Sequence, residues 1–383
     1  MLETVRIENY KSIQKLKLEL GRVTVLIGEN GCGKSNILEA IALASAAADD
    51  KLDNEFLASR GIRVTEPQFM RSAFEKDNSA RDIQLSLLGQ DSQEFSFVLH
   101  NENQPYSQWL NQEADKRFIL KFREYFNTFD GNKEELIKSL LDDDRKFINI
   151  FKEPISKLID SVKLHNFLIY SPENYSLRIF EREDQIQPLG IYGEGLFKLL
   201  QVLSLEENQE KLTEIKALLR LIDWFKDFEI PRTYSEFEYS LQIADRYLDP
   251  DLTYFDQRSS NEGFLFLLFY FTLFISDITP KFFAIDNIDA SLNPRLCRRL
   301  MQELVELAKK HDKQVIFTTH NPAVLDGLDL DDDEQRLFVI YRNQLGHTKA
   351  RRILKPEPLE GQEPVKLSEA FLRGYIGGLP KNF

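Results

Sequence analysis

The stretch Val23-Thr24-Val25-Leu26-Ile27-Gly28-Glu29-Asn30-Gly31-Cys32-Gly33-Lys34-Ser35 decides the fold of this chain. It contains the pattern G-x-x-x-x-G-K-S between an apolar, β-branched run and the helix-forming run Asn36-Ile37-Leu38-Glu39-Ala40-Ile41. A strand before and a helix after are the context that a phosphate-binding loop requires. The bare pattern arises by chance in roughly one chain in a hundred of this length. We therefore predict that the chain binds a nucleoside triphosphate.

The residue types of this loop match the parts of a bound triphosphate. Glycines let the backbone turn tightly and bring its N–H groups to phosphate oxygens, and the helix that follows adds the positive end of its dipole. Lys34 is predicted to reach the β- and γ-phosphates, and the Ser35 hydroxyl to take a Mg²⁺ position. The residues of the loop predicted to bind the nucleotide are Glu29, Asn30, Gly31, Cys32, Gly33, Lys34, Ser35 and Asn36.

Length and composition exclude several classes of protein. A chain of 383 residues forms one large domain or two to three smaller ones with a sizeable core. Its two cysteines, Cys32 and Cys297, make no disulfide framework and suit a reducing compartment, so we expect a cytoplasmic protein. The apolar run Phe264–Ile275 is too short to span a bilayer, which predicts a buried helix and no membrane contact. A net charge of −13 argues against a protein that coats nucleic acid everywhere, although a local basic path stays open.

Hydrophobic periodicity predicts an α/β fold with a mixed sheet and helical insertions. Residues 5–10 and 16–20 alternate between apolar and polar, as half-buried strands do, and feed the apolar strand 23–27. We predict an N-terminal part of the ATPase domain at 1–104 and a charged helical insertion at 105–165. The C-terminal part covers 166–383 and contains a helical block at about 196–228.

A second group of chemically informative residues follows much later in the chain. The apolar strand 281–285 ends at Asp286, and the strand 314–319 ends at His320. Taken alone, Asp286 is a surface carboxylate after a core strand, and a histidine at a strand end is more often structural than catalytic. If these strands are neighbours of the strand 23–27, however, all three end at one edge of the sheet, where ligands bind in open α/β folds. Asn293 and Pro294 are predicted to start the intervening helix.

These motifs resemble those of the ABC-type ATPases of the RecF, SMC and OLD kind. The chain is more closely similar to compact ATPase subunits of bacterial anti-phage systems such as RloA, the Septu subunit PtuA and the PARIS subunit AriA. The resemblance covers about 1–100 and 165–383 and implies an ABC-type P-loop ATPase head with ATP and Mg²⁺ as cofactors. It implies Walker B at Asp286, a Q-loop candidate at Gln68, a D-loop at Ala290-Ser291-Leu292-Asn293 and a switch histidine at His320.

The resemblance also assigns roles across a dimer. The signature segment matches Ser259-Ser260-Asn261-Glu262-Gly263, whose Ser260, Asn261 and Gly263 would contact a nucleotide held by another subunit. A homodimer or higher homo-oligomer with ATP at its interface is therefore implied. The implied catalytic residues are Asp286, Asn287 and His320, and the implied Mg²⁺ ligands are Ser35 and Asp286.

Two positions depart from the family pattern. Asn287 occupies the position where family members usually carry the glutamate that polarises the attacking water, and Asn261 replaces a serine of the signature. An amide cannot accept a proton at neutral pH, so a general-base contribution of roughly 10²–10⁴-fold should be missing. Asp289 is an alternative carboxylate for this role, but it lies two residues further along the turn, which is a different position. We therefore expect firm ATP binding and slow hydrolysis.

Three functions are compared for this sequence. The first is a sensor or regulatory subunit of an anti-phage defence complex that controls a separate effector nuclease. The nuclease is expected on a separate chain, because the roughly sixty residues after His320 are too few for an added catalytic domain of ordinary size. The second is a RecF-like DNA repair or chromosome-maintenance ATPase that acts directly on DNA. The third, a small-molecule kinase or GTPase, would not explain the signature residues or His320. An acidic run at Asp329–Glu334 is interpreted as a solvated loop rather than a metal site.

Overall fold

The computed structural model describes two compact units of the chain, each considered by itself. The described residues are 1–90, 94–104, 106–113, 163–164, 166–179, 188–231, 240–249, 251–355 and 365–379. The first unit comprises Met1–Gly21, Asn30–Phe167 and Ile340–Arg351, and the second Arg22–Glu29, Leu168–Val339 and Arg352–Phe383. Most of the predicted helical insertion at 105–165 lies outside the described residues, so it stays a prediction.

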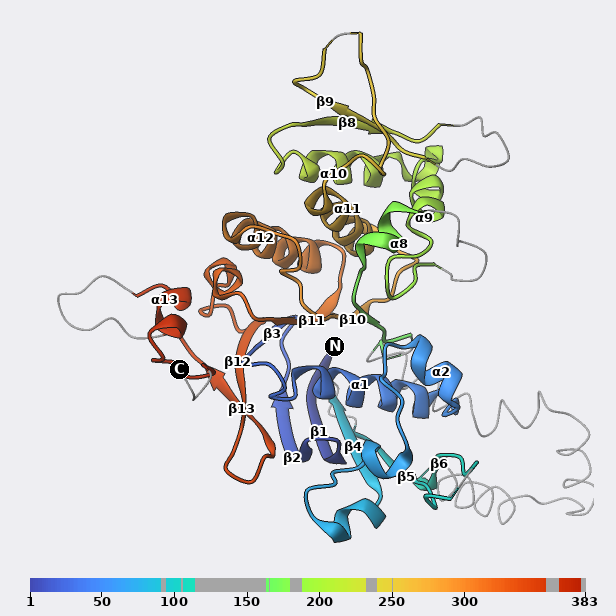
Figure 1. Ribbon diagram of the computed structural model, residues 1–383, viewed down its shortest axis with the longest axis vertical. Helices are drawn as coiled ribbons and strands as arrows, with labels where there is room; N and C mark the ends of the chain where they lie inside the picture. The colour runs from blue at the N-terminus through green and yellow to red at the C-terminus, as the bar shows by residue number, and fades with distance from the viewer. Residues whose placement is uncertain are drawn as a thin grey trace, which may run out of the picture. The chain divides into compact units, whose positions relative to one another are not determined.

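The first unit is built on an antiparallel sheet with strand order β2-β1-β4-β5-β6. Its strands are β1 (Leu2–Tyr10), β2 (Ile13–Glu19), β4 (Ile83–Gly89), β5 (Glu94–His100) and β6 (Leu110–Asn111). The predicted alternation is confirmed in β1, where Val5 and Ile7 are buried and pair with both neighbouring strands. Helix α1 (Lys34–Ala48) packs on β1 and β4 and is almost entirely buried (Figure 1). The shorter helices are α2 (Asn54–Ser59), α3 (Pro67–Met70) and η1 (Lys76–Ala80).

A mixed six-stranded sheet with order β13-β12-β3-β11-β10-β7 organises the second unit. Its strands are β3 (Val23–Ile27), β7 (Ile169–Tyr170), β10 (Phe282–Ile285), β11 (Gln314–Thr319), β12 (Gln335–Arg342) and β13 (Thr348–Ile353). The last residues of β12 and the first of β13 belong to the first unit. The inner pairs are parallel, and β3 is buried along its whole length, as its continuous apolar run predicts. The predicted α/β fold with a mixed sheet is confirmed.

Helices of the second unit surround one helix that is apolar along most of its length. Helix α11 (Glu262–Ile275) contacts its helical neighbours on several sides, and its residues from Phe264 to Ile275 are all buried (Figure 1). The predicted buried helix is thus confirmed. The other helices are α8 (Asn174–Arg178), α9 (Leu196–Leu203), η4 (Glu206–Asn208), α10 (Gln209–Leu219), α12 (Pro294–Lys310), η5 (Pro322–Gly327) and α13 (Leu367–Leu372). In the described part of the chain, every helix is too short or too polar to cross a bilayer.

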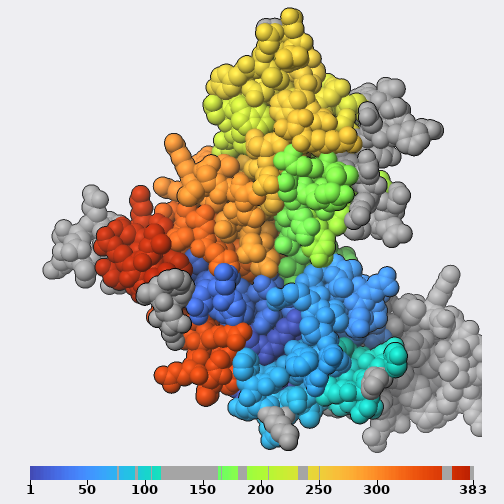
Figure 2. Space-filling model, in the orientation of Figure 1, coloured from blue at the N-terminus to red at the C-terminus, as the bar shows by residue number. Residues whose placement is uncertain are grey.

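The predicted helical block at about 196–228 ends earlier than expected. Helix α10 stops at Leu219, and β8 (Phe225–Glu229) pairs antiparallel with β9 (Gln242–Asp245). The buried Phe225 and Phe228 that end the predicted block pack their rings against each other from this strand. Tertiary packing has decided the structure of this short apolar run, which periodicity alone assigns poorly. The yellow segment around β9 lies at the surface of the second unit (Figure 2).

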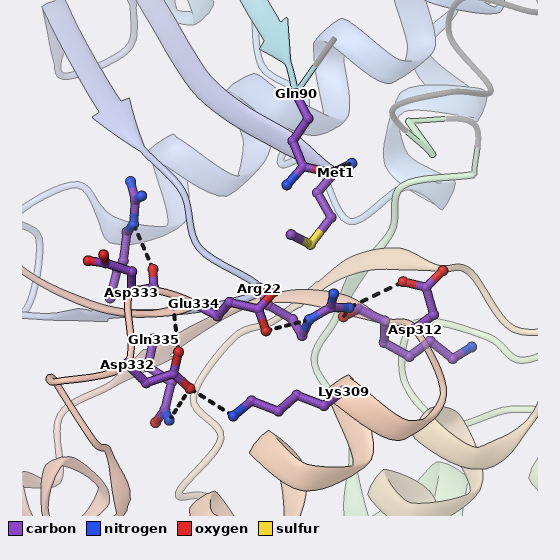
Figure 3. A network of polar contacts seen from close by, with 11 residues as sticks. Met1, Arg22, Gln90, Lys309, Asp312, Asp332, Asp333, Glu334 and Gln335 are labelled. Carbon is purple, nitrogen blue, oxygen red and sulfur yellow. Dashed lines mark hydrogen bonds and ion pairs between the residues drawn. The ribbon is translucent and has the colours of Figure 1, made fainter.

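The acidic run before β12 is a salt-bridged turn rather than a simply solvated loop. Glu334 and Asp312 both pair with Arg22, at 3.0 and 3.2 Å, just before β3 (Figure 3). Asp332 accepts from Lys309 of α12 at 2.8 Å. Within the described ranges, no three His, Cys, Asp or Glu side chains are grouped closely enough to hold a metal ion. The carboxylates of the run therefore tie the starts of β3 and β12 to the end of α12.

Candidate nucleotide-binding site

The phosphate loop reaches α1 through two glycines with positive φ. Gly31 has φ +73° and Gly33, which precedes the first helical residue, has φ +107°. The residue at the N-cap of α1, Gly33, has no side chain that could cap the first turn of the helix. Lys34 is 5% exposed, and its Nζ lies 3.9 Å from the Cys32 Sγ. A buried ammonium beside the N-terminus of a helix is a suitable environment for phosphate.

The outer side of this loop is held by the β12–β13 hairpin. The Gly31 carbonyl accepts from the Arg342 Nε at 2.8 Å, and the Cys32 carbonyl accepts from the Thr348 Oγ1 at 2.8 Å. A Cβ on Gly33 would lie 2.1 Å from the Thr348 Oγ1 and 2.8 Å from the Ser12 Oγ. Side chains of the hairpin and of the loop before β2 therefore fill the space that a larger residue would need at Gly33.

In the second unit, the three expected strand ends meet at one edge of the sheet. β3 pairs in parallel with β11, with Ile27 opposite Thr319, and β11 pairs in parallel with β10, with Phe317 opposite Ile285. The residues that follow these strands, Gly28, His320 and Asp286, leave the sheet at the same edge. The prediction that the three strands are neighbours is confirmed.

Asp286 is oriented by a threonine that the sequence reasoning missed. The Thr318 hydroxyl donates to Asp286 Oδ1 and accepts from the Asn287 N–H at 2.9 Å. Thr318 is fully buried, whereas Asn287 is exposed and has φ +56°, a conformation that asparagine tolerates better than most residues. The carboxylate at 286 is thus fixed, and the amide at 287 points from an exposed turn.

Asp289, the alternative general base, is already engaged. Its Oδ1 accepts from the Thr319 hydroxyl at 2.6 Å, and Thr319 in turn accepts from the Asn321 N–H at 3.0 Å. This chain of bonds ties the turn after β10 to the residues around His320. Asp289 therefore has a structural partner in the buried end of β11.

The signature and D-loop segments lie side by side within the second unit. Asn261 caps α11, since its Oδ1 accepts from the Phe264 N–H at 2.9 Å. Glu262 accepts from the Ser291 hydroxyl at 2.7 Å, and a Cβ on Gly263 would be 3.7 Å from the Ser291 carbonyl. Asn261 and Ser291 are exposed. The two segments assigned to act in trans thus form one continuous surface.

Other predicted site residues have different surroundings. Gln68 is exposed on α3, and its amide donates to Glu66 at 2.8 Å. Asn36 donates to the Ser12 Oγ at 2.6 Å, and the buried Ser260 hydroxyl has no hydrogen-bond partner among the described residues. His320 is exposed. The residues that sequence reasoning missed are Thr318, Glu262, Arg342 and Thr348. Glu262 lies within the predicted signature segment and Thr318 lies two residues before the predicted His320, so these two carried a positional signal, whereas Arg342 and Thr348 carried none.

A protein-family model supports the interpretation of these motifs. The model described as "AAA domain, putative AbiEii toxin, Type IV TA system" matches residues 23–326, which run from the start of β3 beyond His320. The match therefore includes the phosphate loop, the signature segment, Asp286 and the D-loop.

Curated relatives match shorter stretches. Uncharacterized protein MJECL10 of Methanocaldococcus jannaschii is 30% identical over 137 residues, which is 34% of this chain and 58% of that protein. DNA replication and repair protein RecF of Bacillus cereus is 28% identical over 89 residues, 22% of this chain and 23% of RecF. The chain thus spans less than two thirds of the length of these relatives.

Solved structures share the fold. The Smc head bound to the C-winged helix domain of ScpA superposes with a TM-score of 0.55 at 14% identity and covers 92% of this chain and 98% of that one. An Smc head domain with an extended coiled coil, bound to the C-terminal domain of ScpA derived from Pyrococcus furiosus, gives a TM-score of 0.50 at 14% identity, with coverages of 92% and 96%. The predicted ABC-type ATPase head is confirmed as the fold.

Proposed function

The chain belongs to the AAA_21 domain family, and from that premise we propose that it binds Mg²⁺·ATP between two copies of itself and hydrolyses it slowly. The observation that carries ATP binding is the phosphate loop: two positive-φ glycines that lead into the start of α1, and a buried Lys34. Together these supply N–H donors and a cation of the kind that phosphate requires.

Oxygen donors fit the proposed magnesium ion. Mg²⁺ prefers hydroxyl, carboxylate and phosphate oxygens, and in this proposal Ser35 and Asp286 hold it. The fixed orientation of Asp286 by the buried Thr318 suits a metal ligand, because an oriented carboxylate loses less freedom on binding. The ion would neutralise charge on the transferring phosphoryl group.

Slow hydrolysis follows from the chemistry of the residues after β10. Asn287 can hold a water but cannot take its proton, and Asp289 is bonded to the Thr319 hydroxyl. Neither residue therefore supplies the general base at the position where the family glutamate acts. ATP would then act as a long-lived ligand that holds two protomers together rather than as a fuel consumed quickly.

Dimerisation is supported by which residues are exposed. Asn261, Asn287, Ser291 and His320 are all exposed in the second unit. The Ser291–Glu262 hydrogen bond joins the signature segment to the D-loop, so a second protomer would meet one surface. In the proposal these residues complete the nucleotide site of that protomer.

The biological role we propose is a sensor or regulatory subunit of a bacterial anti-phage defence complex, which controls a separate effector nuclease. The toxin-system description of the matching family supports a role in defence. The RecF match favours the alternative, an ATPase that acts directly on DNA. Plating efficiency of phage on cells that carry the complete locus, with wild-type protein or Lys34→Ala, separates the two. Protection lost with Lys34→Ala supports the sensor; unchanged plating together with steeply salt-dependent duplex binding supports the alternative.

Restoring the missing carboxylate tests the proposed slow turnover. Asn287→Glu should raise the rate of phosphate release by about 100-fold or more, because a general base contributes that much. Asn287→Ala serves as the matched control and should stay as slow as the wild type. Binding of a fluorescent ATP analogue should persist in both variants and disappear in Lys34→Ala. A wild-type protein that already turns over about ten times per second, within the ordinary range for enzymes, would contradict the proposal.

A further inference from the structure

Two consecutive carbonyls of the phosphate loop are held from outside. Gly31 C=O accepts from Arg342 and Cys32 C=O from Thr348, both from the β12–β13 hairpin more than three hundred residues along the chain. A trans peptide is planar, so its N–H points opposite to its C=O. The N–H groups of Cys32 and Gly33 must therefore point away from the hairpin. Successive N–H groups turned to one side form an anion-binding concavity.

A directed chain of hydrogen bonds leads to one of these carbonyls. Arg63 Nη2 donates to Asn36 Oδ1 at 3.0 Å, which fixes the orientation of the amide and turns its nitrogen towards the Ser12 Oγ at 2.6 Å. Ser12 then gives its proton to the Thr348 Oγ1, 2.7 Å away, because the Thr348 proton goes to the Cys32 carbonyl. With these assignments, every bond from Arg63 to the Cys32 carbonyl has a donor and an acceptor.

Arg63, the first residue of this chain of hydrogen bonds, is anchored on α1 through Glu39. Glu39 is 1% exposed and accepts from Arg63 Nε at 2.5 Å, from Lys11 and from the Tyr10 hydroxyl at 3.2 Å. A buried carboxylate with two cationic partners is strongly held. Arg63 is thereby fixed relative to the helix that the loop enters. The chain of bonds thus connects two points of the same motif, the body of α1 and the loop before it.

The space beside Gly33 explains why this arrangement leaves little room for adjustment. Thr348 is fully buried, and its hydroxyl and that of Ser12 occupy the place where a Cβ at 33 would lie. At Gly33, the loop, the hairpin and the residue before β2 are therefore packed closely against each other. The two inner bonds, from Ser12 to Thr348 and from Thr348 to the Cys32 carbonyl, are buried, and hydrogen bonds in such a setting strengthen one another.

We propose that Thr348 and Arg342 are positioning residues, which hold the phosphate loop in its anion-binding conformation before a nucleotide arrives. The inference rests on the proposed ATP binding and adds how the site is prepared for it. The β12–β13 hairpin acts as an external brace: it fixes the two carbonyls outward and so directs the Cys32 and Gly33 N–H groups to the phosphates. Preorganisation of this kind raises affinity because ordering is not required at the moment of binding.

Thr348→Val and Thr348→Ser test the brace. Valine has the shape of threonine without the donor, and serine keeps the donor. In the full chain, Thr348→Val should weaken the binding of both Mg²⁺·ATP and Mg²⁺·ADP about tenfold, since the N–H groups serve any bound phosphate. Thr348→Ser should restore affinity to within about twofold of the wild type, because a single good hydrogen bond supplies an effect of this size. Hydrogen exchange in the nucleotide-free protein should quicken at residues 28–36 in the valine variant only.

Arg342→Met keeps the test open if the buried valine variant does not fold. Its side chain is only partly buried, and methionine retains the length without the donor to Gly31. Arg351→Met, an exposed position on β13, is the matched control. Arg342→Met should weaken nucleotide binding several-fold and Arg351→Met should not. A purely structural role would lower the melting temperature of Thr348→Val while folded protein binds nucleotide with wild-type affinity, and that result would overturn the inference.

Failure of the inference is distinguishable from failure of the proposed function. If wild-type protein and Lys34→Ala both fail to bind ATP, the proposed function is wrong. If wild-type protein binds ATP, Lys34→Ala does not, and the valine and serine variants bind alike, only the brace is wrong.

Discussion

The starts of α1 and α11 differ in how they satisfy their N–H groups. Helix α11 begins after Asn261, whose side chain accepts from the Phe264 N–H at 2.9 Å, and α12 begins in the same way with Asn293 and the Leu296 N–H at 3.0 Å. Helix α1 begins after Gly33, which has no side chain to act as a cap. Capped starts stabilise their helices directly, by about 1 kcal/mol each. The start of α1 lacks the stabilisation that a capping side chain at position 33 would give.

This difference teaches how binding sites can be told from ordinary helix starts. At α11 and α12 the sequence places a short polar residue at the cap, and the preceding backbone is extended. At α1 it places a glycine with φ +107°, and the polar side chains nearby hold the outward carbonyls instead. The start of α1 thus lacks a capping side chain, and the loop before it is instead oriented through its Gly31 and Cys32 carbonyls. The proposed trans role of α11 requires less of the helix start, because its cap already satisfies one donor.

The largest effect is expected from Gly33→Ala, which puts a side chain at the start of α1. An alanine at φ +107° is strained, and its Cβ would lie 2.1 Å from the Thr348 Oγ1. We expect a loss of about 3 kcal/mol in the free energy of unfolding, together with loss of detectable ATP binding. Urea unfolding and a fluorescent nucleotide titration measure the two effects.

Gly31→Ala is the control for strain without a clash. Gly31 also has positive φ, +73°, but no atom lies within 4 Å of the added Cβ. Its cost should be about 1 kcal/mol, the conformational penalty alone. Equal losses of stability in both variants would show that the packing of Thr348 on Gly33 is unimportant.

A smaller effect is expected from Asn261→Ala, which opens the start of α11. Loss of the cap should cost about 1 kcal/mol of stability. If Asn261 also contacts the nucleotide of a second protomer, ATP-dependent dimerisation should weaken about tenfold as well, as measured by sedimentation with Mg²⁺·ATP. The control is Asp53→Ala at the start of α2, where the Asp53 Oδ1 accepts from the Phe56 N–H at 2.9 Å. This variant should lower stability without affecting dimerisation. Equal dimerisation of the two variants would confine Asn261 to capping.

Much of the fold was predictable because its signals are local. The β-branched run before Gly28, the buried helix from Phe264 to Ile275 and the Asn293-Pro294 start of α12 each follow from short-range patterns, and the structure confirms them. The boundary near Phe225 failed because a short apolar run fits a strand or a helix equally well and distant packing decides. The prediction that three strands end at one edge of the sheet needed only the rule that ligands bind at the carboxyl ends of strands in open α/β sheets.

The supports of the site were not predictable from the sequence. Thr348 and Arg342 reach the phosphate loop through pairings that join positions more than three hundred residues apart, and a lone threonine in a strand carries no motif. Thr318 lies two residues before His320, but its role follows only from the structure, in which its hydroxyl bonds to both Asp286 and the Asn287 N–H. Motifs give the groups that touch a ligand, whereas the groups that hold them depend on the folded neighbourhood.

The smallest expected effect concerns α12, a helix whose start is capped by Asn293 and whose last turn carries two lysines. Its last turn carries Lys309, which donates to Asp332 at 2.8 Å. Burial by itself would raise the pKa of Asp332, but hydrogen bonds from Lys309, Gln335 and the Glu334 N–H outweigh it and lower this pKa from 3.8 to about 2. Because the folded pKa lies below the unfolded one, the stabilisation is present at neutral pH and is lost as the pH falls from about 4 towards 2.

Asp332→Asn should therefore reveal a contribution that depends on pH and is independent of nucleotide. The shift corresponds to about 2 kcal/mol at most, and solvent screening of this partly exposed pair reduces it to about 1. We expect the variant to be less stable than the wild type by that amount at pH 7 and by about half as much at pH 3. ATP should stabilise both proteins equally, because the Lys309–Asp332 pair holds the end of α12 and is not part of the proposed nucleotide site. A gap in stability that is constant from pH 7 to pH 3 would show that Asp332 acts through shape or hydrogen bonding rather than charge.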